Sequence, residues 1–271
     1  MSTIVSYKPN TKRRLSNFWT VLREKDLDPS IGLLWMDDFM GLSGPALVAN
    51  TVTAWGPYEV RIDTSNTVKI IANEAERYVE LATDATDNDA VEIGFGETAD
   101  QAQLGTKVAI GNIKCFEALV NLSDVTTAQG AFVGMAAPGT VAAGGDAFLA
   151  DSATELATID AIGFRIVEGD PDGWDAVYGK AGAAVTIVKE VAHAAIVDTW
   201  VALGWLFDAV NNKILYYANG ILVASASLTA TAPTNWPNGN GLSVAACIKN
   251  GTTTARKMRL MQWACGMYTG L

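Results

Sequence analysis

The sequence is poor in the side chains that bind transition metals or act as general bases. It has one histidine, His193, in an alanine-rich segment, and three cysteines without CxxC spacing. A single imidazole excludes histidine-rich metal sites, and no Gly-x-Ser-x-Gly elbow supports a hydrolase triad. Cys115, Cys247 and Cys265 lie in apolar, strand-like runs. We therefore expect buried thiols from a reducing compartment, and no disulfide framework, zinc site or cofactor.

Long apolar runs are also missing. The N-terminal residues MSTIVSYKPNTKRR lack the apolar core of a signal peptide. The most apolar later window, residues 192–210, is interrupted by His193, Asp198 and Asp208. We expect a soluble protein that has no membrane partner and is not exported by the general secretory route.

Positive charge is scarce outside the first 25 residues. That segment holds six Lys or Arg residues and one Glu, a net charge of +5, whereas the remainder holds 13 cationic and 28 anionic side chains, a net charge of −15. An acidic body disfavours nucleic acid as a partner, while the basic segment is suited to an acidic protein surface.

Residues 1–30 are predicted to form an arm and a short helix. The first 14 residues are polar and basic and contain Pro9, which is typical of an extended arm ordered by a partner. Ser16 is a candidate cap for a helix whose apolar stripe packs either on the chain's own body or on another subunit. The candidate partner-binding residues of this segment are Lys8, Lys12, Arg13, Arg14, Phe18, Trp19 and Leu22.

Residues 31–271 are predicted to form one β domain. The segment 199–227, TWVALGWLFDAVNNKILYYANGILVASAS, alternates apolar residues and contains Asn219-Gly220, a pair that suits a type I′ turn. It predicts three consecutive antiparallel strands. About a dozen short strands separated by polar turns, with no convincing amphipathic helix after residue 30, predict an all-β, two-sheet antiparallel jelly-roll sandwich.

The same segment resembles the concanavalin A-like, laminin-G-like jelly-roll family. Trp35-Met36-Asp37-Asp38-Phe39 resembles the opening strand of such modules in bacteriophage virion proteins, and Leu260 to Trp263 is similar to their closing strand. The resemblance covers residues 31–271. It implies the fold, and it implies one of several roles that this fold serves: lectin, glycoside hydrolase, adhesion module or virion surface protein.

The hydrolase pattern of that family is Glu-x-Asp-x-x-Glu, which places an acid and a nucleophile on one face of a strand. This chain departs from it. Glu92 and Glu97 are five residues apart, so a regular strand would point them to opposite faces, and the segment from Asp160 to Phe164 carries one carboxylate. We therefore expect no enzymatic activity.

Two further groups of residues are candidate binding sites. The segment 84–89 superficially resembles a calcium loop through Asp84, Asp87 and Asp89, but it lacks the glycine of an EF-hand, so a solvated acidic turn is the favoured interpretation. Three tryptophans next to Gly or Pro are candidates for stacking on glycans, with anchoring of loops as the alternative: Trp55, Trp174 and Trp236.

These features predict a structural phage virion protein. The arm would bind the major capsid protein or another virion subunit and so decorate or cement the capsid surface, with the jelly roll as an outward knob. The resemblance implies a homotrimer, made in the host cytoplasm. The alternative is a carbohydrate-binding adhesion module on a virion or cell surface, with a glycoside hydrolase in third place.

Overall fold

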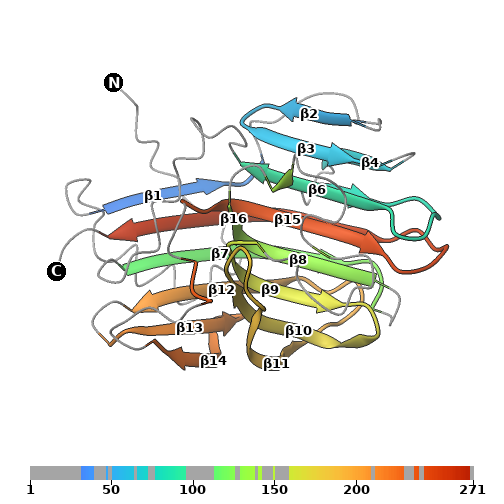
Figure 1. Ribbon diagram of the computed structural model, residues 1–271. Coiled ribbons are helices and arrows are strands. Elements are labelled where there is room, and N and C mark those ends of the chain that lie inside the picture. The colour runs from blue at the N-terminus through green and yellow to red at the C-terminus, as the bar shows by residue number, and fades with distance from the viewer. Residues whose placement is uncertain are drawn as a thin grey trace, which may run out of the picture.

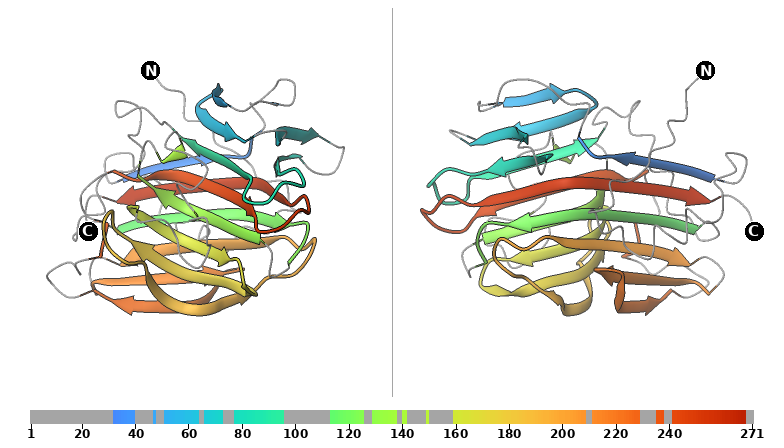
Figure 2. Two further views of the ribbon diagram at one scale, coloured as in Figure 1. Left: turned by 45° about the vertical axis from the view of Figure 1, so that its right-hand side comes forward. Right: turned by 180° about the vertical axis from the view of Figure 1, so that it is seen from behind.

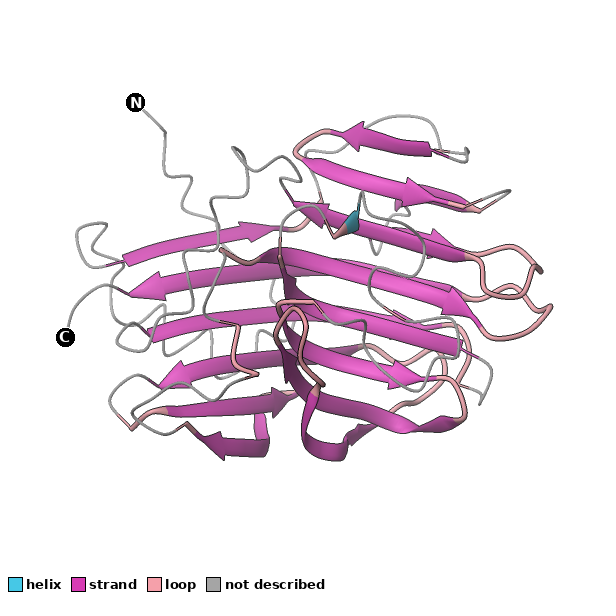
Figure 3. Ribbon diagram, viewed as in Figure 1, coloured by secondary structure: helices cyan, strands magenta, loops and turns pink. Residues whose placement is uncertain are grey.

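The computed structural model describes residues 32–39, 47, 51–63, 66–72, 77–95, 113–125, 129–137, 140–141, 149, 159–208, 211–228, 235–237 and 241–268. The predicted arm and helix of residues 1–30 lie outside these ranges. The described residues form sixteen strands in two layers (Figures 1 and 3). None of their helical residues forms a segment long and apolar enough to cross a bilayer.

Sheet A has eight strands. Its order is β14-β13-β12-β7-β16-β5-β4, and β1 also pairs with β16. The strands of sheet A are β1 (Gly32–Asp37), β4 (Thr67–Ala72), β5 (Arg77–Ala82), β7 (Ile113–Leu122), β12 (Val201–Asp208), β13 (Lys213–Ala218), β14 (Ile221–Ser227) and β16 (Lys257–Tyr268).

Sheet B also has eight strands, in the order β11-β10-β9-β8-β15-β6-β3-β2. Its strands are β2 (Thr51–Trp55), β3 (Tyr58–Ile62), β6 (Ala90–Phe95), β8 (Gln129–Ala136), β9 (Ala161–Val167), β10 (Asp170–Gly179), β11 (Thr186–Ala194) and β15 (Ser243–Asn250). Every pairing in both sheets is antiparallel. The sheets stack face to face, as the turned views in Figure 2 show. The prediction of an all-β, two-sheet antiparallel sandwich is confirmed.

The three-strand meander predicted for residues 199–227 is present as β12, β13 and β14. Asn219 and Gly220 both have positive φ angles, 51° and 79°, as a type I′ turn requires. Leu203, Trp205 and Phe207 alternate along β12 and are completely buried between the sheets. Because alternate side chains of a strand point to the same face, this spacing is enough to place one apolar face of the meander in the core.

The main core lies between the sheets and includes polar atoms that bridge them. The hydroxyl of Tyr216 on β13 donates to the carbonyl oxygen of Val177 on β10 at 2.8 Å. The indole Nε1 of Trp263 on β16 donates to the hydroxyl of Tyr58 on β3 at 3.2 Å. Each bond joins sheet A to sheet B. These aromatic side chains therefore bury apolar area and also fix the position of one sheet relative to the other.

A second buried cluster covers the outer face of sheet B. Phe132, Val177 and Cys247 point away from the main core, yet they are completely buried, together with Val141 and Leu149 from the connection between β8 and β9. The Phe132 ring lies over a close pair of facing glycines on β8 and β9, where a Cβ added to Gly134 would lie 2.9 Å from the ring. This part of the sheet is therefore interior on both sides.

Candidate functional site

The candidate glycan-stacking tryptophans are core residues. Trp55, Trp174 and Trp236 are at most 6% exposed. Trp174 lies in β10 instead of a loop, and Trp236 packs its ring 5.0 Å from that of Tyr178. A stacking platform needs an open ring face, and these three rings face protein. This burial corrects the candidate role in stacking on glycans. The loop-anchoring alternative fits Trp236, whereas Trp55 and Trp174 lie in the strands β2 and β10.

The acidic segment 84–89 is held to the body by Asn250. The backbone N–H of Asn250 donates to the carbonyl oxygen of Asp89 at 2.9 Å. The side-chain NH2 group of Asn250 donates to the carbonyl oxygen of Thr86 at 3.2 Å. A carboxylate oxygen of Asp84 accepts from the N–H of Thr86 at 2.7 Å. This is a turn closed by its own side chains.

Two carboxyl groups of this turn interact with each other. Burial, a hydrogen bond to Asp84, and the negative charges of Asp84 and Asp63 together raise the pKa of Asp89 to about 7. Among the described residues, no group of three His, Cys, Asp or Glu side chains is arranged to hold a metal ion. Asp87 is exposed and belongs to no such group. The segment is an acidic turn in which Asp87 is exposed and Asp84 and Asp89 are partly buried.

The candidate residues of the arm lie outside the described ranges. They are Lys8, Lys12, Arg13, Arg14, Phe18, Trp19 and Leu22. Their proposed role in binding a partner stays a prediction.

A row of cross-strand neighbours crosses the outer face of sheet B, with charged side chains towards both ends and Cys247 and Phe132 between them. Cross-strand partners bring the row together in the order Arg61, Glu92, Cys247, Phe132, Arg165 and Asp175. The guanidinium Nε of Arg165 lies 3.5 Å from a carboxylate oxygen of Asp175, and both side chains are buried. The other carboxylate oxygen of Asp175 accepts from the N–H of Val191, whose φ angle is 48°. Asp175 thus holds an irregular position of β11.

The carboxylates of this face are badly placed for glycoside hydrolysis. Glu92 and Asp175 are four strands apart, about 19 Å at ~4.8 Å per strand. Glu59 is nearer to Glu92, on a diagonal of about 7–8 Å, which is within the range used by inverting enzymes. However, Glu92 is 0% exposed and directly faces Arg61 across the two strands. A carboxylate that no solvent reaches is not positioned to attack or protonate a polysaccharide.

Exposed apolar side chains gather at one corner of the sandwich, where β11 and β14 lie side by side as the edge strands of the two sheets (Figure 1). We call this group the apolar corner. Its five members are between 38% and 68% exposed: Val191, Ile196, Val197, Ile221 and Leu222.

Hydrogen bonds from three elements hold the apolar corner together. The side-chain oxygen of Asn219 accepts from the N–H of Ala202 at 3.0 Å, which ties the β13–β14 turn to the start of β12. The N–H of Asp198 donates to the carbonyl oxygen of Leu122 at 2.8 Å, which ties the β11–β12 connection to β7. Lys189 Nζ donates to the carbonyl oxygen of Val223 at 3.1 Å and joins β11 to β14.

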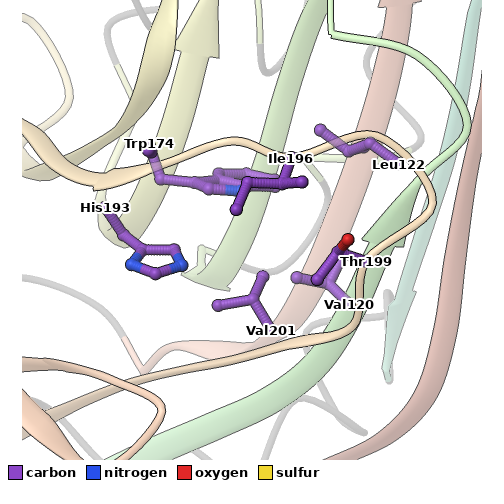
Figure 4. A pocket seen from close by; sticks show the side chains of 8 residues that line it. Val120, Leu122, Trp174, His193, Ile196, Thr199 and Val201 are labelled. Atoms are coloured by element: carbon purple, nitrogen blue, oxygen red, sulfur yellow. The ribbon is translucent and has the colours of Figure 1, made fainter.

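A small pocket opens at the apolar corner (Figure 4). It is shallow: the space between its lining atoms is about 270 Å³ only when the open solvent at its mouth is included. Its lining is apolar apart from one hydroxyl and one imidazole, and comprises Val120, Leu122, Trp174, His193, Ala194, Ile196, Thr199 and Val201. Burial lowers the pKa of His193, so the imidazole is neutral at pH 7 and adds no charge to the apolar surroundings.

Comparison with known proteins identifies the fold and gives no information on function. No protein-family model matches the chain, and no curated protein matches it. Among solved structures, a protein of unknown function, SO2946 from Shewanella oneidensis MR-1, is 14% identical with a TM-score of 0.51, and the match covers 98% of this chain and 99% of that one. A Bacteroides ovatus GH16 enzyme of a mixed-linkage glucan locus is 9% identical with a TM-score of 0.52, covering 84% and 98%. Peanut lectin is 10% identical with a TM-score of 0.49, covering 87% and 97%.

The fold is the concanavalin A-like jelly roll. The strand order and the matches agree on this point, and the sequence resemblance to that fold family is confirmed. At such low identity, nothing beyond the fold carries over from these proteins, because lectins and hydrolases share it.

The apolar corner was not foreseen from the sequence. Ile221 and Leu222 read as ordinary strand residues after a turn, and His193 as a structural or incidental histidine. A signal is nonetheless present: the segment ILVASAS of β14 contains no ionisable side chain. Natural edge strands commonly carry charge, so an edge strand without any is a distinctive feature of this surface.

Proposed function

We propose that this chain is a structural subunit of a bacteriophage virion, without enzymatic activity, that decorates or cements the capsid surface. Residues 1–30 attach it to the major capsid protein or another virion subunit, and the jelly roll is an outward knob. The subunit is made in the host cytoplasm and assembles as a homotrimer.

The apolar corner is the observation that carries this proposal. Soluble monomers rarely keep several large aliphatic side chains exposed side by side, and such groups are typical of assembly surfaces. The five side chains come from β11, β14 and the β11–β12 connection, which are fixed by the hydrogen bonds described above. A subunit of a larger particle accounts for a rigid, preformed patch of this kind.

Charge supports the attachment by the arm. The first 25 residues carry +5 and the remainder −15, so the arm is attracted to an acidic lattice that repels the body. This arrangement orients the jelly roll outwards and speeds docking at low salt.

The carbohydrate-binding alternative has no specific support among the described residues. Its aromatic candidates Trp55, Trp174 and Trp236 are buried, and the outer face of sheet B is covered at its centre by Val141 and Leu149. The buried Glu92 likewise gives no support to the hydrolase alternative.

Deletion of residues 1–30 tests the attachment. Heads of the phage that encodes the chain are assembled without it, then incubated with full-length or truncated protein, and bound protein is counted by electron microscopy. We expect the truncated protein to leave the heads bare. Full occupancy without the arm would refute the proposal.

Charge reversal separates attraction by the arm from a general effect of charge. We expect Arg13→Glu with Arg14→Glu to lower occupancy and to reduce its dependence on salt. Reversal of an exposed cation of the body, Lys213→Glu, is the matched control and should change neither.

A further inference from the structure

We propose that the apolar corner is a self-association surface, on which the same corner of another copy of this chain docks. Val191, Ile196, Val197, Ile221 and Leu222 then become buried between subunits. The inference deepens the homotrimer of the proposed function and rests on it, but it does not depend on the attachment of residues 1–30 to a virion, which the arm deletion tests separately.

The exposed side chains form one patch because their elements are bonded to each other. Lys189 Nζ on the Val223 carbonyl holds β11 against β14, so Val191 and the first residues of β14 lie on two strands that contact each other. The Asn219 turn bonds to Ala202, close to Val201 in the pocket lining. The pocket, the connection with Ile196 and Val197, and the tip of β14 are therefore continuous.

Charge at the rim favours a second copy as the occupant. Exposed Lys189 and Glu190 are neighbours on β11, at the border of the patch. Asp198 follows Val197 and pairs with Arg259 at 2.7 Å, and β14 has no ionisable side chain. A rim that carries charges of both signs is self-complementary, because the Lys189 of each copy can face the Glu190 of a neighbouring copy around a closed ring. A strongly acidic or basic partner would instead meet one like charge.

The contact is made by side chains and not by added strands. Val223 interrupts the regular pairing of β13 with β14, since Tyr216 pairs with Ala224 and Tyr217 with Leu222. The carbonyl oxygen of Val223 is already occupied by Lys189. A bulge and a capping lysine are devices that block strand addition at an edge. They leave the aliphatic side chains of Ile221 and Leu222 exposed for packing.

Leu222→Glu in the full-length chain is the first test. Leu222 is 52% exposed, so the variant is expected to fold, which circular dichroism and thermal unfolding verify. Burying an unpaired carboxylate in the contact should raise the dissociation constant by at least about tenfold. Light scattering coupled to size exclusion over a wide concentration range measures it. The matched control is Ala54→Glu, an exposed position of β2 at the opposite edge of sheet B.

Cross-linking provides the second test. Since Cys115, Cys247 and Cys265 are buried, Leu222→Cys adds one accessible thiol to each chain. A short bismaleimide should join Leu222→Cys chains into covalent oligomers, and it should leave Ala54→Cys chains as monomers.

The outcomes divide cleanly. A wild-type oligomer that dissociates in Leu222→Glu and is captured by cross-linking at position 222 supports the proposal, and its mass gives the subunit number. A wild-type chain that stays monomeric at the highest concentration overturns it, as does an oligomer that Leu222→Glu leaves intact.

Discussion

Replacing Glu80 with Gln tests how charges hold the outer face of sheet A together. The side chain of Glu80 on β5 is 5% exposed and lies among three cations. Its carboxylate oxygens are 3.0 Å from Lys69 Nζ, 3.2 Å from Arg259 Nε and 3.5 Å from Lys257 Nζ. These contacts link β4, β5 and β16. Gln keeps the shape of the side chain, removes its charge and replaces one accepting oxygen with a donating NH2 group.

The expected cost lies between two limits. An exposed ion pair contributes about 0–1 kcal/mol, whereas breaking a fully buried pair costs about 3–5 kcal/mol. Glu80 is buried, but its three partners are between 22% and 42% exposed, so solvent screens the loss in part. We expect Glu80→Gln to lower the free energy of unfolding at pH 7 by about 2 kcal/mol.

The pH dependence of that cost is the sharper test. Burial alone would raise the pKa of Glu80, but the hydrogen bond from Lys69, the charge of Lys257 and the hydrogen bond from Arg259 outweigh it, and the pKa is lowered. A carboxyl group whose pKa is lowered by folding stabilises the protein above its ordinary pKa. That contribution is lost as the pH falls through the lowered value.

Urea unfolding of both proteins at pH 7 and at acidic pH measures the difference. We expect the gap between wild type and Glu80→Gln to close towards acid, since both side chains are then neutral. Asp87→Asn, which changes an exposed carboxylate in the same way, should be near neutral at both pH values. A gap below about 0.5 kcal/mol at pH 7, or one that is equal at both pH values, would refute the reasoning.

Two further substitutions test other parts of the described structure. The pKa of Asp89 is raised to about 7, so ionisation of this carboxyl destabilises the folded state. The melting temperature of Asp89→Asn should therefore rise relative to that of wild type as the pH goes from 4 towards 7. A difference that shrinks over this range would contradict the prediction. A Cβ on Gly134 would lie 2.3 Å from the carbonyl oxygen of Ile162 and 2.7 Å from Gly163 Cα. Gly134→Ala should therefore cost about 1–3 kcal/mol in urea unfolding, and more than Gly179→Ala, whose Cβ would come no closer than 3.3 Å.

The strands were predictable because local alternation specifies them. Leu203, Trp205 and Phe207 repeat every second residue and are buried as the pattern requires, and Asn219-Gly220 predicts its own turn geometry. The strand β2 was missed. Its sequence, TVTAW, offers few large aliphatic residues, and Trp55 stands next to Gly56, so the segment resembled a loop.

The site was less predictable because exposure depends on strand order. Ile221 and Phe132 both read as strand residues. Ile221 is 68% exposed since β14 is an edge strand, whereas Phe132 is buried on the outer face of sheet B by residues from another connection. Trp174 stands next to Gly173, which favours a loop, yet β10 continues through both residues. Which strands become edges is a property of long-range pairing, which local periodicity does not encode.

The order of the strands also governs when the molecule can fold. The last two strands, β15 and β16, are the interior strands that join the two halves of each sheet, β15 between β8 and β6 and β16 between β7 and β5. The fourteen other described strands therefore leave the ribosome before these two, and until residues 243–268 emerge the partly built halves expose pairing edges on both layers. A chain whose synthesis stalls before residue 243 is left with unjoined half-sheets that are prone to aggregate.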